Sequence, residues 1–171
     1  MQLRRAAAED IDAIMNVIRR VVPLMQASGN FQWNENYPNA AIFARDVERE
    51  QLWLAEVDHQ IAGMAAITTD QEPEYAQARW DPSETAVVVH RLAVDPTLWG
   101  KGIAASLMRQ AEVVASARKI QVLRVDTNTE NEAMQKLFPK LGYSPAGEIG
   151  LGSRPGLKFC CYEKRLRKPG V

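Results

Sequence analysis

The sequence predicts an α/β fold in which helices flank a mixed, mostly antiparallel β-sheet. Val87–Val94 is a nearly continuous run of apolar and β-branched residues, which is typical of a strand buried on both faces. A second such strand, Val122–Thr127, follows after a helical segment, and strands joined by such a crossover run parallel. Two hairpin-like segments, Leu52–Ile67 and the region around Gly150–Gly156, add antiparallel strands to the sheet.

The chain opens with a short strand and an amphipathic helix. Gln2–Arg5 is predicted to form the strand. Apolar residues then recur at helical spacing and define one buried face of a helix. Pro23 is expected to kink this helix near its end. The buried face consists of Ile11, Ile14, Met15, Ile18, Val22 and Met25.

A loop, a second helix and a hairpin come next. Ser28–Asn36 is predicted to be the loop. Pro38 suits the first position of a helix, which we expect to run to Glu50. Leu52–Ile67 then predicts a hairpin, with its turn within Val57–Gly63.

The second half of the chain alternates strands and helices within one predicted domain, residues 1–171. A loop, Asp70–Pro82, leads into the long strand Thr85–Val94. Apolar residues from Ile103 onward then have helical spacing. The remaining predicted elements are a helix over 101–118, a strand over 121–127, a helix over 131–141 and a closing hairpin around Gly150–Gly156.

A glycine-bearing turn joins the long strand to the helix that follows it. Asp95-Pro96 ends the strand, because proline cannot donate to the ladder and restricts the residue before it. Gly100-Lys101-Gly102 then leads straight into the helix. The N–H groups of a helix N-terminus lack partners, the helix dipole favours negative charge, and glycine lets a phosphate approach the backbone. We therefore expect a phosphorylated ligand here.

Two known phosphate-binding patterns fit this turn poorly. The Walker A spacing Gly-x-x-x-x-Gly-Lys-Ser/Thr is absent from the sequence. The Rossmann pattern Gly-x-Gly-x-x-Gly is matched only in part, because Ala105 stands at the third glycine. Asp126 also lies further along the chain than the acidic residue of that pattern should.

A third pattern fits better. Trp99–Ala104 resembles the Gln/Arg-x-x-Gly-x-Gly/Ala loop of the GNAT superfamily of acyl-CoA N-acetyltransferases, with Trp99 in place of the usual Gln or Arg. Asn131–Tyr143 resembles the family segment Asn-x-x-Ala/Met-x-x-Leu-Tyr-x-Lys-x-Gly-Phe/Tyr. Leu52–Ile67 resembles the family's hairpin. Two motifs in the right order with a strand between them are stronger evidence than either alone, and the resemblance covers about the whole chain.

The resemblance implies a twisted sheet with helices on both faces. Its central parallel strands, which end near Val94 and Asp126, are expected to splay apart so that acetyl-CoA binds in the gap. Backbone groups of the strand end and the loop would hold the cofactor, and the Asn131 segment would meet its pantetheine arm. Asn131 equally suits the N-cap of the helix that follows. The implied cofactor-binding residues are Leu92, Ala93, Val94, Trp99, Gly100, Lys101, Gly102, Ile103, Ala104, Ala105, Asn131, Phe138 and Lys140.

Proton handling is where the chain departs from the family. The resemblance places a glutamate base at Val88 and a tyrosine general acid at Phe138, and neither side chain can exchange a proton. His90 lies two residues from Val88, on the same strand face unless a bulge intervenes, and its ordinary pKa near 6.5 suits a base. A hydrogen-bonded core histidine explains the same residue. Glu84, acting through water, is the second candidate base, and Tyr143 is the fallback proton donor to the leaving thiolate.

Acidic and aromatic residues gather in two segments that border the acceptor site in the resembled fold. Residues 70–84 hold five acidic residues against one basic residue, Arg79. Coulomb attraction and cation–π contact would favour a small cationic amine, although a solvated loop with aromatics packed on the core explains the same pattern. Arg91, Arg154 or Arg79 would instead suit an acceptor carboxylate. The aromatic candidates for substrate contact are Trp33, Tyr37, Tyr75 and Trp80.

Composition excludes several classes of protein. The 21 Lys and Arg balance the 21 Asp and Glu, so the basic footprint of a nucleic-acid-binding protein is absent. The sequence contains no run of 18 apolar residues, so it predicts no membrane span. The first residues lack the apolar region of a secretory signal. Cys160 and Cys161 are adjacent and do not easily pair, and no spacing predicts a metal site. We expect a reducing, cytoplasmic location. The sequence leaves the oligomeric state open, a homodimer included.

The resemblance predicts an N-acetyltransferase that moves an acetyl group from acetyl-CoA to the primary amine of a small cationic metabolite, by direct attack in a ternary complex. The alternative is an acyl-CoA-binding module with weak or no catalysis, because the family's usual residues are missing at Trp99, Val88 and Phe138. A third hypothesis, a nucleotide-dependent oxidoreductase, has only the partial Rossmann pattern as its support. Turnover of any amine with acetyl-CoA separates the first two hypotheses.

Overall fold

The α/β fold class is confirmed by a computed structural model that describes residues 1–167. Within this range seven strands form one sheet, in the order β1-β2-β3-β4-β5-β7-β6. Strands β4 and β5 pair in parallel, and the registered pairs β1–β2, β2–β3, β5–β7 and β6–β7 are antiparallel. The chain divides into two compact units, which we describe in turn. The first unit comprises Met1–Ile67 and His90–Gln110, and the second comprises Thr68–Val89 and the residues from Ala111 on.

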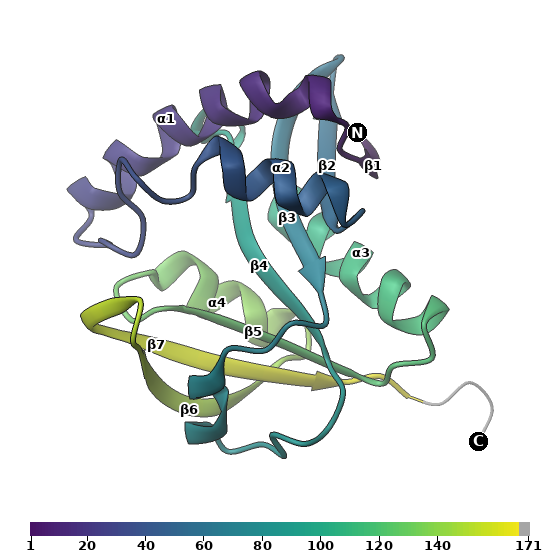
Figure 1. Cartoon of the computed structure of the whole chain (residues 1–171), viewed down its shortest axis with the longest axis vertical. Helices are drawn as coiled ribbons and strands as arrows, with labels where there is room; N and C mark the ends of the chain where they lie inside the picture. The colour runs from purple at the N-terminus through teal and green to yellow at the C-terminus, as the bar shows by residue number, and fades with distance from the viewer. Residues whose placement is uncertain (168–171) are drawn as a thin grey trace. The chain divides into compact units, whose positions relative to one another are not determined.

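The first unit is built on β2 and β3, and Figure 1 shows α1 and α2 on one face of these strands. Short 3₁₀ helices, Ala8–Asp10 and Pro96–Leu98, precede α1 and α3. The unit also receives the end of β4 and the start of α3. The bounds are β1 Gln2–Arg5, α1 Ile11–Ala27, α2 Ala40–Glu48, β2 Leu52–Val57, β3 Gln60–Thr68, β4 Val87–Val94 and α3 Ile103–Ala117.

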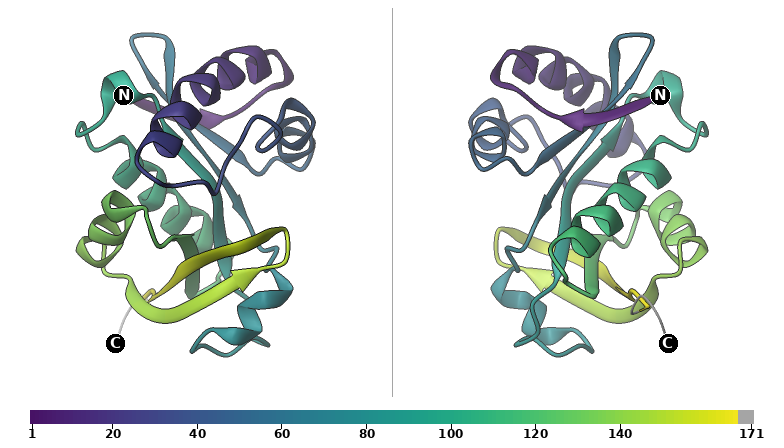
Figure 2. Two further views of the ribbon diagram at one scale, coloured as in Figure 1. Left: turned by 90° about the vertical axis from the view of Figure 1, so that its left-hand side faces the viewer. Right: turned by 90° about the vertical axis from the view of Figure 1, so that its right-hand side faces the viewer.

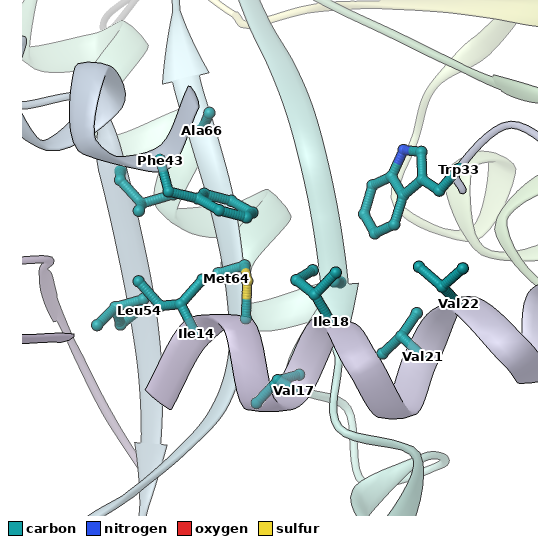
Figure 3. Close-up of a cluster of buried hydrophobic side chains, with 12 residues drawn as sticks. Ile14, Val17, Ile18, Val21, Val22, Trp33, Phe43, Leu54, Met64 and Ala66 are labelled. Atoms are coloured by element: carbon teal, nitrogen blue, oxygen red, sulfur yellow. The ribbon is translucent and has the colours of Figure 1, made fainter. Parts of the chain in front are cut away.

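A hydrophobic core joins α1 and α2 to the sheet. Ile14 and Ile18 of α1 point toward Met64 of β3, with Phe43 of α2 beside them (Figure 3). The other face of β3 meets α3 at Gly63. A Cβ there would lie 2.8 Å from the Ala93 carbonyl oxygen and 3.0 Å from the side chain of Ile103, so only glycine fits. Helices therefore cover both faces of β3.

Three predicted boundaries in this unit were wrong. Helix α2 begins at Ala40, two residues after Pro38, because Asn39 is its N-cap and accepts a hydrogen bond from the Ile42 N–H at 3.0 Å. It also ends at Glu48 instead of Glu50. The β2–β3 turn is only Asp58-His59, and both residues have positive φ, as the tight turns of twisted hairpins require.

The second unit is centred on β5, β7 and β6. Alternating side chains of β7 face opposite ways: Cys161 packs with Tyr75 of the 3₁₀ helix Pro73–Gln77, and Tyr162 packs on Phe138 of α4. Figure 2 shows α4 and this 3₁₀ helix on opposite sides of the β6–β7 hairpin. Asp70–Pro82, predicted to be a plain loop, therefore contains an element that covers the sheet. The remaining bounds are β5 Val122–Asn128, α4 Glu132–Lys140, β6 Ser144–Leu151 and β7 Arg154–Arg165.

The sequence predicted neither a membrane span nor a metal site. None of the helices within residues 1–167 has the length and apolar character needed to cross a membrane. Over the same range, no three His, Cys, Asp or Glu side chains group in a way that could hold a metal ion.

Candidate active site

The glycine turn of the first unit is an open stretch of backbone. Gly100 and Gly102 both have φ of +78°, a conformation that favours glycine, and no described atom lies within 4 Å of a Cβ built at either residue. Helix α3 starts at Ile103, and the first helical hydrogen bond runs from the Ser106 N–H to the Gly102 carbonyl at 3.0 Å. The helix was predicted to start at residue 101, but the positive φ of Gly102 delays it.

The turn therefore presents unused hydrogen-bond donors. The N–H groups of Ile103, Ala104 and Ala105 precede the Ser106 N–H, which is the first helical donor, and have no carbonyl to bond within the helix. The positive end of the helix dipole lies at the same place. The pyrophosphate of a coenzyme A molecule fits this arrangement, because its oxygens can approach the backbone where the glycines leave space. The half-buried side chains of Ala104 and Ala105 are short enough to permit it.

Asp95 anchors the turn to the rest of the first unit. Its buried carboxylate caps the 3₁₀ helix by accepting hydrogen bonds from the Thr97 N–H at 3.0 Å and the Thr97 hydroxyl at 2.8 Å. It also pairs with Arg20 of α1, and its own N–H donates to the Ala62 carbonyl of β3 at 2.8 Å. Burial alone would raise the pKa of Asp95, but the hydrogen bonds from Arg20 and Thr97 outweigh it and lower the pKa.

Trp99 folds back over the turn it precedes. Its indole N–H donates to the Val94 carbonyl at 3.0 Å, and its side chain is half exposed. This hydrogen bond links Trp99 to the end of β4 and so closes the short loop that the chain forms before the glycines. This contact gives a structural reason for an aromatic residue where the family has Gln or Arg.

Arg91 interrupts the regular backbone of β4. Its φ of +52° is unusual for a residue other than glycine, so the strand's alternation does not pass unchanged through this point. Its guanidinium is clamped by Asp46 of α2, with N–O distances of 2.7 and 2.8 Å, and donates to the Tyr37 hydroxyl at 3.3 Å. Burial opposes the charge of Arg91, but Asp46 raises its pKa above the ordinary value. Arg91, a candidate for holding an acceptor carboxylate, already holds one from the protein.

The other candidates of the first unit have different surroundings. His90 is half buried and directly precedes Arg91, so the irregular backbone of β4 lies one residue beyond it and not between Val88 and His90. Leu92 and Val94 are half buried, and Ala93 is part of the core around α1. Trp33 is also buried in that core, which favours its packing role over substrate contact.

Glu84, the second candidate base, lies in the second unit and is engaged in an ion pair. Arg165 of β7 donates to its two carboxylate oxygens at 2.9 and 2.5 Å. The hydrogen bonds from Arg165 lower the pKa of Glu84. A carboxylate with a lowered pKa is a weaker base, so this pair argues against Glu84 as a proton acceptor.

A buried arginine organises the segment around residues 70–84. The Arg124 guanidinium is fully buried and bonds Glu163 at 2.9 Å, the Gln71 side chain at 2.6 Å and the Asp81 carbonyl at 2.8 Å. It also lies over the Trp80 ring, 4.7 Å from the ring centroid. Trp80 was a candidate for contact with a substrate cation, and one face of its ring is occupied by a cation of the protein.

Two further substrate-contact candidates lie near the β6–β7 hairpin. Tyr75 is buried against Trp80, with ring centroids 5.0 Å apart, and its hydroxyl donates to Asp126. Arg154 begins β7 and donates to the Ser153 carbonyl at 3.0 Å. Glu74 accepts from the Gly152 N–H at 2.9 Å, which ties the 3₁₀ helix to the hairpin turn.

The second motif forms the N-terminal cap and the buried side of α4. Asn131 caps the helix by accepting from the Met134 N–H at 3.3 Å, as one of its two interpretations expected. Phe138 is buried between Tyr143 and Tyr162, and Lys140 is exposed. The Tyr143 hydroxyl is buried without a hydrogen-bond partner among the described residues. Burial, and next the charge of Glu112, raises the pKa of Tyr143, so it keeps its proton at neutral pH.

Four polar residues of these surroundings were not predicted from the sequence to be part of the site. Asp95 had a signal, since Asp before Pro often caps a turn. Arg124 and Asp126 also had one, because charged residues are rare in a buried strand, and both lie within the strand predicted over 121–127. Asp46 had none, because its partner Arg91 is far away in the sequence.

Comparison with known proteins agrees with this geometry. Residues 18–143 match the family model described as the Acetyltransferase (GNAT) family. The N-acetyltransferase YesJ of Bacillus subtilis (strain 168) is 22% identical over 151 residues, which cover 86% of this chain and 83% of YesJ.

Two solved structures extend the likeness. A GNAT-family acetyltransferase from Streptococcus agalactiae matches with a TM-score of 0.85 and 27% identity, covering 98% of this chain and 96% of that one. The acetyltransferase yncA of Salmonella typhimurium, whose structure contains acetyl-CoA, matches in fold with a TM-score of 0.71 and 17% identity, covering 100% and 96%.

Proposed function

Because the chain belongs to the GNAT acetyltransferase family, we propose that it is an N-acetyltransferase that uses acetyl-CoA to acetylate a primary amine of a small cationic molecule. The reaction is direct attack of the amine in a ternary complex. The observation that carries the proposal is the open turn, where Gly100 and Gly102 at φ +78° precede the N-terminus of α3. A phosphorylated carrier fits that turn without displacing any side chain.

Cofactor binding is assigned to backbone groups. The N–H groups of the two glycines and of residues 103–105 would hold the pyrophosphate. The N–H of Lys101 donates to the Leu98 carbonyl, and its exposed side chain would add a screened positive charge. By resemblance, Asn131 and Phe138 would flank the pantetheine arm, and Lys140 belongs to the same motif. When bound, acetyl-CoA supplies an acetyl group activated as a thioester.

The chain must also manage protons and charge. A lysine-like amine with a pKa near 10.4 is only about one part in a thousand neutral at pH 7.4, so it must lose a proton before attack. We assign that proton to His90, because Glu84 is held by Arg165 with a lowered pKa. By resemblance, a backbone N–H of Leu92–Val94 would polarise the thioester carbonyl. Tyr143, which keeps its proton at neutral pH, remains the fallback donor to the thiolate.

The test is a panel of primary amines with acetyl-CoA, followed by release of the free thiol. The panel includes diamines, monoamines, and amino acids that carry a carboxylate. Turnover with cationic amines supports the proposal. Preference for an amino acid would instead favour acceptor binding through Arg154 or Arg79.

The alternative function, an acyl-CoA-binding module, predicts a different result. Coenzyme A would bind with a measurable heat in calorimetry, and no amine of the panel would release thiol above the rate without protein. Any amine-dependent turnover that saturates with protein present removes this alternative.

We further propose a cytoplasmic location, because Cys160 and Cys161 are both free thiols, which a reducing compartment preserves. The proposed partners are acetyl-CoA and a small-molecule amine, with neither nucleic acid nor membrane. A homodimer also remains a proposal, and the mass of the protein in solution, measured by light scattering, tests it.

A further inference from the structure

The glycine turn of the first unit has no side-chain packing of its own. No described atom lies within 4 Å of a Cβ built at Gly100 or Gly102. Glycine also loses more conformational freedom than any other residue when it is ordered. Ordering such a turn during binding lowers the affinity for a ligand, unless the chain on either side already holds the turn in place. The conformation of the turn therefore depends on how its two ends are held.

The end that precedes the glycines is held through Asp95. Between β4 and the turn lies only the short 3₁₀ helix Pro96–Leu98, and Asp95 is its N-cap. The Leu98 N–H donates to the Asp95 carbonyl at 2.9 Å, and the Lys101 N–H donates to the Leu98 carbonyl at 3.4 Å. Hydrogen bonds thus connect Asp95 stepwise to the residue between the two glycines. A displacement of Asp95 would therefore displace the turn.

The two carboxylate oxygens of Asp95 have different partners. Oδ1 accepts hydrogen bonds from the Thr97 N–H at 3.0 Å and from the Thr97 hydroxyl at 2.8 Å. Oδ2 accepts from the guanidinium of Arg20 on α1, which is 75 residues away in the sequence. One oxygen therefore fixes the chain that leads to the turn, and the other ties this chain to α1.

The charge of Asp95 exceeds what a cap requires. Asn and Ser cap helices about as well as Asp and have no charge to desolvate. Asp95 is only 6% exposed, yet the hydrogen bonds from Arg20 and Thr97 outweigh its burial and lower its pKa, so it is ionised at neutral pH. Arg20 supplies the positive charge that pairs with it. The ionised carboxylate is thus explained by the link to α1.

Arg20 is not part of the hydrophobic core. Its side chain is 50% exposed, whereas the buried face of α1 consists of apolar residues such as Ile14 and Ile18. A pair between exposed side chains contributes little to stability, but here the partner carboxylate is buried. The guanidinium is therefore placed to hold Asp95, and its removal leaves the packing of α1 intact.

We propose that Arg20, acting through Asp95, holds the glycine turn in the conformation that binds the pyrophosphate of coenzyme A. This inference rests on the proposed acetyltransferase function and extends its cofactor site to α1. Arg20 and Asp95 are positioning residues, because they act on the turn and not on the cofactor. Part of the affinity for coenzyme A then comes from an arginine that lies outside the turn.

The test is calorimetric titration of the full chain with two ligands, coenzyme A and dephospho-coenzyme A, which lacks the 3′-phosphate but keeps the pyrophosphate. The variants are Arg20→Met, Asp95→Asn and the double variant. Asp95→Asn keeps an oxygen acceptor for Thr97 and removes the charge that pairs with Arg20. Arg19→Met is the matched control, because Arg19 is the neighbouring exposed arginine of α1 and donates to Asn16 of the same helix.

We expect Arg20→Met and Asp95→Asn each to weaken the binding of both ligands by about 2- to 10-fold, the range of one net hydrogen bond. The double variant should lose no more than the larger single loss, because both changes remove the same link. Arg19→Met should bind like the wild type.

The signs of these changes exclude two other roles for Arg20. A long-range effect of charge on the phosphates would weaken binding in Arg20→Met, strengthen it in Asp95→Asn and cancel in the double variant. A purely structural role would lower the unfolding temperature and leave the affinity of the folded protein unchanged. Loss of affinity in all three variants is expected only if the pair positions the turn.

Wild-type affinity for coenzyme A in Arg20→Met would overturn the inference, as would tighter binding by Asp95→Asn. A loss in Arg20→Met that is larger for coenzyme A than for dephospho-coenzyme A would also overturn it, because Arg20 would then contact the 3′-phosphate directly. If Asp95→Asn does not fold, Thr97→Val replaces it by removing the hydroxyl donor to Oδ1, and wild-type affinity in that variant overturns the inference.

Binding and turnover separate this inference from the proposed function. A wild type that binds neither ligand refutes both. Amine turnover with an affinity that is indifferent to Arg20 refutes only the inference. Arg20-dependent binding without turnover of any amine refutes the acetyltransferase function and leaves the positioning role of Arg20 standing.

Discussion

The turn between β4 and α3 and the segment between β3 and β4 differ in the groups that give them their shape, which are backbone groups in the turn and side chains in the segment. The turn is made of backbone: two glycines at positive φ and a helix N-terminus, with Asp95 fixing one end. The other segment is made of side chains, and Arg124, Arg165 and the β6–β7 hairpin hold it in place. A backbone site binds a feature that all acyl-CoA molecules share. A side-chain site can differ from one relative to the next, so selectivity for the acceptor is expected there.

The largest effect should come from the base, where the two units offer one candidate each. His90→Gln in the first unit should lower turnover by about 10²- to 10⁴-fold at neutral pH, since that is the usual contribution of a positioned base. The acidic limb of its pH–rate profile should also disappear. Steady-state kinetics of His90→Gln and Glu84→Gln, side by side, measure this. A larger loss of turnover in Glu84→Gln than in His90→Gln would indicate that the base is Glu84, in the second unit.

The side-chain character of the second segment can be tested at Arg124. Arg124→Met removes one partner of a buried ion pair and leaves the Glu163 carboxylate and the Gln71 side chain without their donor. Such a loss costs about 3–5 kcal/mol of unfolding free energy. Urea denaturation measures it, with the exposed Arg118→Met as the control. A change below about 1 kcal/mol would mean that Arg124 does not hold the segment.

The backbone character of the turn can be tested with a pair of glycines. Gly102 and Gly156 have φ of +78° and +80° with no described atom near a built Cβ, so valine is equally strained at both. Gly102→Val should weaken coenzyme A binding by about tenfold or more, because its side chain enters the space needed by the pyrophosphate. Gly156→Val should bind normally, and Lys101→Ala should weaken binding only modestly. Calorimetric titration with coenzyme A measures these affinities. Normal binding by Gly102→Val would show that the cofactor does not bind at this turn.

The smallest effect concerns the exposed pair that ties Glu84 to Arg165. The pKa of Glu84 in the folded protein is lowered by Arg165 from an ordinary value of 4.5. The pair therefore stabilises the fold above about pH 4.5, and the stabilisation is lost as the pH falls through the lowered pKa. Glu84→Gln should cost no more than about 1 kcal/mol at pH 7. Thermal unfolding at pH 7 and pH 3.5 should show the difference from wild type shrinking in acid, and a difference that grows would contradict it.

The same contrast explains what could be predicted from the sequence. The strands, the helices after residue 100 and the glycine turn follow from local patterns: apolar runs, helical spacing and a short motif. The boundary errors at Pro38 and residue 101 are also local, because one N-cap asparagine and one positive φ decided them.

The side-chain contacts could not be predicted in this way. Arg124 meets Gln71 across 53 residues of sequence, and Arg165 meets Glu84 across 81. No periodicity or spacing encodes such pairs. Trp80 and Arg91 were assigned to a substrate on residue type alone, and partners from distant segments, Arg124 and Asp46, occupy them.

The neighbouring cysteines of β7 have a practical consequence for measuring the reaction. Thiol-reactive dyes detect released coenzyme A, and they react with thiolates. With a pKa of about 12, the Cys161 thiol is deprotonated in only about one molecule in ten thousand at pH 8. The pKa of Cys160 is raised as well, chiefly by burial. Both shifts slow the reaction of the protein's own thiols with the dye, so the baseline recorded without amine should drift less than it would with ordinary exposed thiols.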